Sequence, residues 1–499
     1  MISDTIPGTS LEKTYNKLLK NKKGDIIVVA VLDSGFDINH EDLKDQIWIN
    51  PKEIPNNNID DDQNGYIDDI HGWNFLGNAK ETLIFENYEF VRVIRQLKSK
   101  FDKLTNDQVK PKDQKLFNIY QKAVNELREN IKSIPDDYTF LNDLVTARKT
   151  IDEYFSTDKY TMDQLSKIDP KGDTILKEHV RNRRFALRYD MNEEWENYYR
   201  RDIEINQKYR LNPEYNGRKL IGDDPNIFGD GRYGNNDLAG DLTLESHGTN
   251  VAAIIAATRN NNLGMNGVLN SVKIMPVRIV PRGDEYDKDI AHAIRYAVDN
   301  GAKIINMSFG KEYSLNKKFV SDAIKYATKH DVLLICSAGN ESSNADEKEF
   351  YPNDYDSNTG LEISNSFISV GASSYSLNKW ILTYFSNYGE KNVDIFAPGK
   401  DIYTAKPNNK YESDAGTSFS APLVSGIAAL IKSYYPKLKA PEIKQILMNS
   451  GTSYQINVKI ELEDGTKKLV PFSELSKSGK IVNAYNALLM SEQISKSKK

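Results

Sequence analysis

Four polar residues, far apart in the sequence, are of the types that together catalyse acyl transfer. Asp33 ends the apolar run VAVLDSG, His247 opens SHGTNVAAIIAA, Asn340 ends LLICSAGN, and Ser418 stands within GTSFSAP. A serine hydroxyl becomes a strong nucleophile when a base such as histidine removes its proton. An aspartate fixes the imidazole tautomer, and an asparagine amide donates to the oxyanion of a tetrahedral intermediate. These roles predict a catalytic site built from the four residues.

Each of these residues also has a structural explanation when it is taken alone. Ser418 could cap the helix that follows it, because serine is a favoured N-cap and proline is tolerated in a first helical turn. Asp33 and Asn340 could stabilise turns at strand ends, and His247 could begin a helix without any chemistry. The chemical interpretation therefore depends on all four roles being filled in one chain.

The segments around these residues predict an α/β protein with a mostly parallel sheet that is covered by helices on both faces. Short apolar runs of the kind found in strands buried on both faces occur at IIVVAVLDSG, SVKIMPVRIV, AKIINMSFG, VLLICSAGN and VDIFAPG. Helical patterns such as DKDIAHAIRYAVDNG lie between the early ones. In open sheets of this kind, functional groups gather at the carboxyl ends of the strands.

A change in composition predicts the domain organisation. The segment 80–240 is rich in charged residues and tyrosine, has helical periodicity in stretches such as LFNIYQKAVNELRENI, and ends in a loop rich in Gly and Asp. We therefore predict a discontinuous domain, residues 1–79 and 241–499, that is interrupted by a helical insertion over 80–240.

Composition also excludes several classes of protein. The formal net charge of −5 does not indicate a nucleic-acid partner, and no apolar run is long enough to span a bilayer. Cys336 is the only cysteine, so no intramolecular disulfide can form. The N-terminus lacks the apolar segment of a signal peptide, which fits either a cytoplasmic protein or a chain whose leader was removed.

A second motif, NNNIDDDQNGYIDD, resembles the first part of an EF-hand calcium loop. Oxygen ligands alternate there around a glycine that permits a sharp turn. The motif departs from the pattern at its last ligand position, where His71 replaces the expected Glu. We predict a structural calcium site that another part of the chain completes, and no organic cofactor; the alternative is a solvated acidic turn. The candidate ligands are Asp60, Asp62, Asn64, Tyr66 and Asp68.

The blocks VAVLDSG, SHGTNVAAIIAA and GTSFSAPLVSGIAAL, in this order, resemble the three catalytic blocks of the subtilisin-like serine peptidases, the subtilases. SAGN resembles the oxyanion-hole block of that family, and the likeness covers about residues 10–79 and 241–490. It implies a subtilisin-like parallel-sheet fold and endopeptidase activity on polypeptides. On this basis Asp33 orients His247, His247 activates Ser418, and Asn340 with the Ser418 N–H holds the oxyanion.

The resemblance also implies where a substrate binds and where the protein acts. INMSFG resembles the family's substrate-binding strand, which would pair with an extended peptide. The residues before Asn340 would line the pocket for the side chain that precedes the scissile bond. The resemblance further implies a secreted or extracytoplasmic bacterial protein. The implied substrate-binding residues are Ser308, Phe309 and Gly310 on the strand, and Ser337, Ala338 and Gly339 in the pocket.

Two other functions remain open. The helical insertion is compatible with a narrow-specificity processing peptidase that serves one partner. A binding protein without catalysis, on the same scaffold, would also explain the blocks, although the presence of all four chemical residues argues against it.

Overall fold

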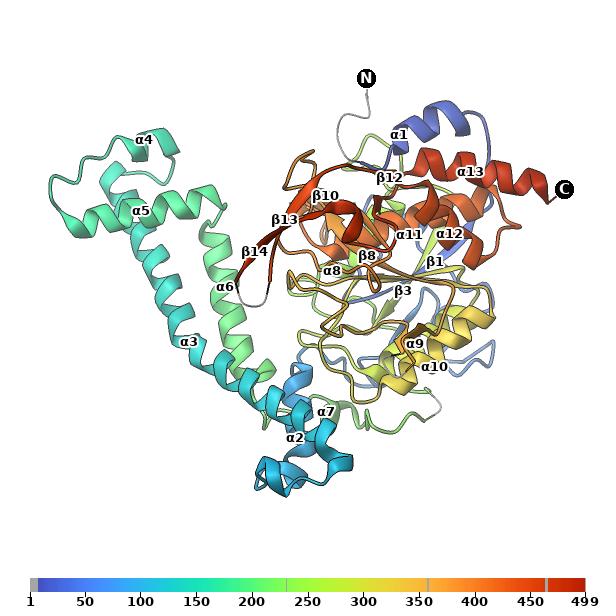
Figure 1. Cartoon of the computed structure of the whole chain (residues 1–499), viewed down its shortest axis with the longest axis horizontal. Coiled ribbons are helices and arrows are strands. Elements are labelled where there is room, and N and C mark those ends of the chain that lie inside the picture. Colours follow the sequence, from blue (N-terminus) through green and yellow to red (C-terminus); the bar gives the residue numbers. More distant parts are fainter. Residues whose placement is uncertain (1–7, 230, 357–358, 463–464, 499) are drawn as a thin grey trace. The chain divides into compact units, whose positions relative to one another are not determined.

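A computed structural model of the protein describes residues 8–229, 231–356, 359–462 and 465–498. It divides into two units, residues 1–84 together with 217–499, and residues 85–216 (Figure 1). The helical unit is therefore shorter than the predicted 80–240, because the Gly/Asp-rich loop belongs to the first unit. Asn235 shows why: its backbone exchanges hydrogen bonds of 2.9 and 3.0 Å with Asn74.

The first unit is organised around a sheet of nine strands among the described residues, in the order β12-β15-β9-β8-β5-β4-β1-β3-β2. Every pair in it is parallel except β12 with β15. This confirms the prediction of a mostly parallel α/β sheet. The strands are β1 (Ile27–Asp33), β2 (Trp73–Asn74), β3 (Val272–Arg278), β4 (Ile304–Met307), β5 (Leu333–Ser337), β8 (Phe367–Ser373), β9 (Ile395–Pro398), β12 (Thr452–Ser453) and β15 (Lys480–Ile481).

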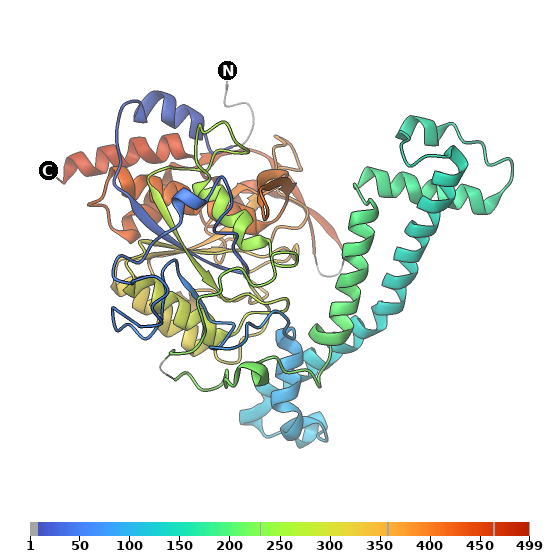
Figure 2. The same cartoon turned by 180° about the vertical axis from the view of Figure 1, so that it is seen from behind.

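Helices cover both faces of this sheet (Figures 1 and 2). They are α8 (His247–Ala256), α9 (Asp287–Asp299), α10 (Lys317–Lys329), α11 (Thr417–Tyr434), α12 (Ala440–Ser450) and α13 (Ala484–Ser497), with the short α1 (Leu11–Thr14) and α7 (Arg218–Ile221) elsewhere in the unit. The described residues of this unit also form three antiparallel ribbons, made by β6 (Tyr355–Asp356) with β7 (Leu361–Glu362), β10 (Ile402–Lys406) with β11 (Lys410–Asp414), and β13 (Asn457–Glu461) with β14 (Lys467–Pro471).

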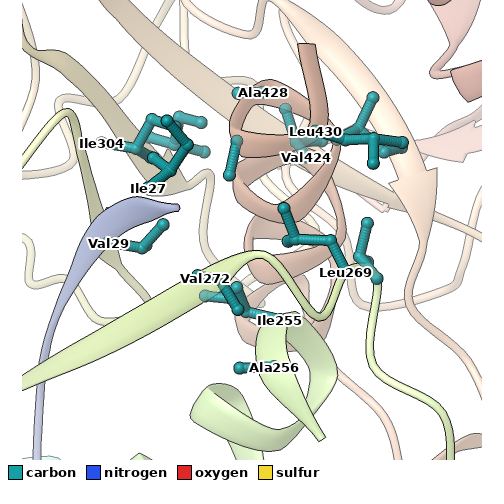
Figure 3. Close-up of a cluster of buried hydrophobic side chains, with 14 of the residues drawn as sticks. Ile27, Val29, Ile255, Ala256, Leu269, Val272, Ile304, Val424, Ala428 and Leu430 are labelled. Carbon is teal, nitrogen blue, oxygen red and sulfur yellow. The ribbon is translucent and has the colours of Figure 1, made fainter. Parts of the chain in front are cut away.

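The alternation of side chains along β1 explains why this strand is apolar up to Asp33. Val29 and Val31 belong to the core beneath α8 and α11, and Figure 3 shows Val29 in this cluster with Val424 of α11. Ala30 and Leu32 belong to the core beneath α9 and α10. Successive residues of a strand point to opposite faces, so a strand with a core on each side needs an unbroken apolar run.

The strand order brings the predicted site segments together. β1, β4 and β5 are parallel neighbours, with Leu32 opposite Met307 and Met307 opposite Cys336. Their carboxyl ends therefore share one edge of the sheet. Asp33 ends β1, Ser308 follows β4, and Asn340 lies three residues beyond β5.

The second unit is helical, as predicted (Figure 1). Its long helix α3 packs against α2, α5 and α6, and Arg148 of α3 joins it to α6 through an ion pair of 2.8 Å with Glu196. The helices are α2 (Glu89–Phe101), α3 (Gln114–Phe155), α4 (Met162–Ser166), α5 (Thr174–Arg188) and α6 (Glu193–Ile205). Within the described part of the chain, every helix is too short or too polar to cross a lipid bilayer.

Candidate active site

Asp33 presents a buried carboxylate to His247 at the carboxyl end of β1. The residue is 1% exposed, and its Oδ1 accepts a hydrogen bond of 2.7 Å from the backbone N–H of Ser34. The same oxygen lies 2.8 Å from Nδ1 of His247. With Nδ1–H donating to Asp33, the imidazole presents its Nε2 lone pair to the outside, which is the tautomer a general base requires.

His247 is held at this position because the start of α8 lies close to the loop that follows β1. It is the first residue of α8, and a Cβ on the next residue, Gly248, would lie 2.8 Å from the Gly35 carbonyl oxygen and 2.9 Å from that of Ser34. Only glycine lets the helix begin this close to the loop after β1. The arrangement keeps the imidazole within reach of Asp33.

The pKa of His247 lies above its ordinary value. Desolvation lowers the pKa, but the Asp33 carboxylate more than offsets this, through its charge and its hydrogen bond, with a further contribution from the charge of Asp414. The side chain is 36% exposed, so its outer edge is open to a ligand. The histidine is thus an accessible base whose protonated form is stabilised by carboxylates.

Ser418 is not the cap of its helix. It is the second residue of α11, and Gly416 occupies the capping position. The helical partner of the Ser418 carbonyl would be the N–H of residue 422, which is a proline and has none. Ser308 fills this gap, because its hydroxyl donates to the Ser418 carbonyl at 2.8 Å.

The hydroxyl of Ser308 is itself fixed by a chain of buried polar groups. Asn306 donates to it from Nδ2 at 2.9 Å, and Ser425 of α11 donates to Oδ1 of Asn306 at 2.8 Å. The first turns of α11 are thereby tied to the end of β4. The predicted substrate-binding residue Ser308 therefore uses its side chain to position Ser418, which leaves its main chain for a ligand.

Asn340 has its amide oriented by Thr417. The backbone N–H and the hydroxyl of Thr417 donate to Oδ1 of Asn340 at 2.9 and 3.0 Å, which leaves Nδ2 as the outward donor. A Cβ on Gly416 would lie 3.0 Å from Oγ of Ser418 and 3.7 Å from Nδ2 of Asn340. The hydroxyl and the amide donor thus both lie beside Gly416.

The four predicted residues therefore lie at one edge of the sheet. Asp33 and His247 form a hydrogen-bonded pair, and Ser418 and Asn340 lie beside the same glycine. The rings of His247 and Phe419, the residue after Ser418, meet edge-on with centroids 5.6 Å apart. Among the described residues, no hydrogen bond joins the Ser418 hydroxyl to His247. Such bonds are often long without substrate and tighten in the complex.

A family model described as the subtilase family matches residues 24–467 of the chain. The chain belongs to the subtilase family. The "Thermophilic serine proteinase" of Bacillus sp. (strain AK1) is 37% identical over 194 residues, covering 38% of this chain and 44% of that protein. The "Major intracellular serine protease" of Bacillus subtilis (strain 168) is 36% identical over 211 residues, covering 42% and 60% respectively.

This subtilase thus spans about half the length of these two relatives, between 44% and 60%. Among solved structures, that of a protease from Pseudoalteromonas arctica is 26% identical and covers 49% of this chain and 70% of that chain, with a TM-score of 0.41. The family assignment rests on the match to the family model.

The acidic loop of this subtilase gathers three carboxylates, one of which was not predicted. Ligand oxygens of Glu53, Asp60 and Asp62 lie within 4.8 Å of one another. Oε1 of Glu53 accepts from the N–H groups of Asp61 and Asp62 at 2.9 and 3.2 Å, while Oε2 is buried without a hydrogen-bond partner. Burial raises the pKa of Glu53. A buried, unpaired oxygen beside two carboxylates fits a hard cation such as calcium.

The remaining predicted ligands turn away from this cluster. Asp68 accepts from the backbone N–H groups of Asn57 and Asn58 at 3.2 and 2.9 Å. Asn64 donates from Nδ2 to Asp69 at 3.1 Å. The ring of Tyr66 packs on Trp73, with centroids 5.1 Å apart, so only its main chain is available to an ion.

The sequence held weak signals for two site residues that were missed. Glu53 is an acidic residue seven positions before Asp60, in the same polar loop. Thr417 lies directly before Ser418, and its hydroxyl, besides donating to Asn340, accepts from the N–H of Gly339 at 3.2 Å. Neither role could be read from spacing, since that of Thr417 depends on segments that meet only in the folded chain and that of Glu53 on how its own loop folds back.

Proposed function

We propose that the protein is a serine endopeptidase that hydrolyses peptide bonds of polypeptides. The observation that carries the proposal is the arrangement at the sheet edge. Asp33 lies 2.8 Å from His247, and the Ser418 hydroxyl and the Asn340 amide lie beside the same glycine, Gly416. A peptide carbonyl bound over this pair would meet a nucleophile on its carbon and a donor on its oxygen.

The reaction follows from these positions. Oγ of Ser418 attacks the carbonyl carbon while its proton passes to Nε2 of His247, and Asp33 stabilises the imidazolium. Nδ2 of Asn340 and the Ser418 N–H bind the oxygen that becomes negative. His247 then returns the proton to the leaving amine, which leaves an acyl-enzyme that water hydrolyses by the same steps in reverse order.

Substrate would bind as an added strand. The main chain of Ser308, Phe309 and Gly310 would pair with an extended peptide, since main-chain hydrogen bonds give such binding its affinity. The segment from Ser337 to Gly339 would receive the side chain before the scissile bond. Because the side chains of Phe309 and Ala338 are buried, both segments offer mainly backbone to a ligand.

Calcium is proposed as a structural ion of the acidic loop. Glu53, Asp60 and Asp62 would hold it, and the main-chain carbonyl of Tyr66 would supply a further oxygen, as the loop pattern predicts. Bound calcium would neutralise the converging carboxylates and stabilise the loop. No step of the reaction involves it.

We also propose an extracytoplasmic location, which fractionation of the producing bacterium tests.

The decisive experiment labels the protein with a fluorophosphonate and measures casein hydrolysis, with Ser418→Ala as the control. We expect labelling and cleavage in the wild type and neither in the variant. Labelling without casein cleavage would favour a processing peptidase of narrow specificity. A folded wild type that neither labels nor cleaves would contradict the proposal and favour a binding protein.

A further inference from the structure

One aromatic ring touches both glycines of the two proposed substrate-binding segments. A Cβ on Gly310 would lie 2.2 Å from Cε1 of Phe350, and a Cβ on Gly339 would lie 3.0 Å from the same atom. Gly310 follows β4 and Gly339 follows β5, and these strands are parallel neighbours. The edge of the Phe350 ring therefore fills the space between the two segments.

The ring is held in place by the backbone around it. The next residue, Tyr351, exchanges backbone hydrogen bonds of 2.9 and 2.8 Å with Lys311, which directly follows Gly310. The Phe350 carbonyl accepts from Nδ2 of Asn353 at 2.6 Å. These bonds fix the backbone of Phe350 beside the segment that follows β4, so a substrate side chain could move the ring only by changing its rotamer.

A second group narrows the same space. A Cβ on Gly339 would lie 2.4 Å from Oε2 of Glu341, and this oxygen accepts from Nδ2 of Asn387 at 2.6 Å. The same Nδ2 donates to the Ala338 carbonyl at 2.9 Å, so the amide ties the carboxylate to the segment. The region beside Gly339 is thus bounded by Phe350 and by a fixed carboxylate.

We propose that Phe350 closes the pocket for the side chain before the scissile bond, so that this protein cleaves after small residues such as alanine, serine and glycine. The inference rests on the proposed peptidase function and names its substrate class. An aromatic or long side chain would have to occupy the volume of the Phe350 ring. In a shaped apolar pocket even one methylene changes kcat/KM by about 10–200-fold, so a whole ring has a large effect.

The test uses internally quenched peptides that differ only at one residue, which is Ala, Leu, Phe or Lys, with cleavage positions located by mass spectrometry. For the wild type we expect kcat/KM after Ala to exceed that after Phe by about tenfold or more. In Phe350→Gly the ratio should shift toward Phe by a similar factor. Phe350→Ala should shift it in the same direction, and the melting temperature of each variant reports its folding.

Tyr435→Gly is the matched control. Tyr435 is a half-buried aromatic residue just past the end of α11, and Ser418 stands at the start of that helix. An 18-residue helix is about 27 Å long, so this variant should keep the wild-type ratio. A wild type that prefers Phe, Leu or Lys, or folded Phe350 variants with an unchanged ratio, would overturn the inference alone. A folded wild type that cleaves none of the peptides and is not labelled by the phosphonate would overturn the proposed function as well.

Discussion

The hydroxyl of Ser308 donates a hydrogen bond of 2.8 Å to the carbonyl of Ser418. This bond joins the end of β4 to the helix turn that carries the proposed nucleophile. It takes the place of the helical bond that Pro422 cannot make, because proline has no N–H. Pro422 thus leaves the Ser418 carbonyl without a helical partner. Ser308, which directly follows β4, binds this carbonyl and so fixes the position of Ser418.

A double-mutant cycle tests this relationship. Ser308→Ala should lower the free energy of unfolding by about 1–3 kcal/mol, since it leaves buried polar groups unpaired. The same change should cost less when Pro422→Ala supplies a backbone N–H for the Ser418 carbonyl. Denaturant unfolding measures both, in a Ser418→Ala background that prevents self-digestion. Strictly additive effects would show that the two residues do not serve the same carbonyl.

Asn340→Ala should lower kcat by about 10²–10³-fold with little change in KM, as removal of such a donor does in subtilisin. The reason is that its Nδ2 meets charge that develops only in the transition state. Steady-state kinetics on a peptide that the wild type cleaves supplies both constants. Asn340→Asp is a useful companion, because it keeps an acceptor for Thr417 and removes the donor. A loss that appears in KM alone would contradict the role.

The sequence correctly predicted the strands and helices whose formation depends on a local pattern of residues. Local patterns correctly predicted the strand that ends at Asp33 and the helix that begins at His247. A strand buried on both faces and the start of a helix each have a characteristic sequence of only a few residues. The strand order that brings Asp33 next to Ser308 leaves no such local pattern, and the sequence did not predict it.

The features that the sequence did not predict depend on contacts of the folded chain, within loops and between distant segments. The predicted insertion, 80–240, extends beyond the helical unit because composition cannot show that Arg218 forms a buried ion pair with Asp289 of α9, which places the start of the Gly/Asp-rich loop in the first unit. Glu53 and Phe350 lie in loops, and their side chains are directed by backbone contacts of the folded chain. No periodicity in the sequence encodes such contacts.

The pH dependence of activity should reflect the raised pKa of His247. The neutral imidazole is the base, so kcat/KM should fall as pH drops through a pKa above the ordinary histidine value of about 6.5. Asp414→Asn removes one carboxylate that raises this pKa, so the acidic limb should move to lower pH while the plateau is kept. Asp322→Asn, on the exposed side of α10, is the control and should leave the profile unchanged. A limb that moves to higher pH would contradict the electrostatic assignment.

Calcium should raise the melting temperature, because an ion that binds only the folded chain stabilises it by mass action, by about 2.7 kcal/mol at one hundred times its dissociation constant. Glu53→Gln, and Asp60→Asn combined with Asp62→Asn, should reduce this response, since they remove the carboxylates that converge in the acidic loop. Differential scanning fluorimetry in calcium, in magnesium and in a chelator measures it.

Asp61→Asn is the matched control for the calcium test. Asp61 lies between two proposed ligands, but its carboxylate accepts from the backbone N–H of Ile54 at 3.0 Å and from Asn57 at 2.8 Å. Its loss should lower the melting temperature in chelator and leave the calcium increment intact. If the Glu53 variant keeps the full increment while Asp60→Asn with Asp62→Asn loses it, the ion is held by the 60–68 segment alone. If all variants keep it, calcium binds elsewhere in the chain.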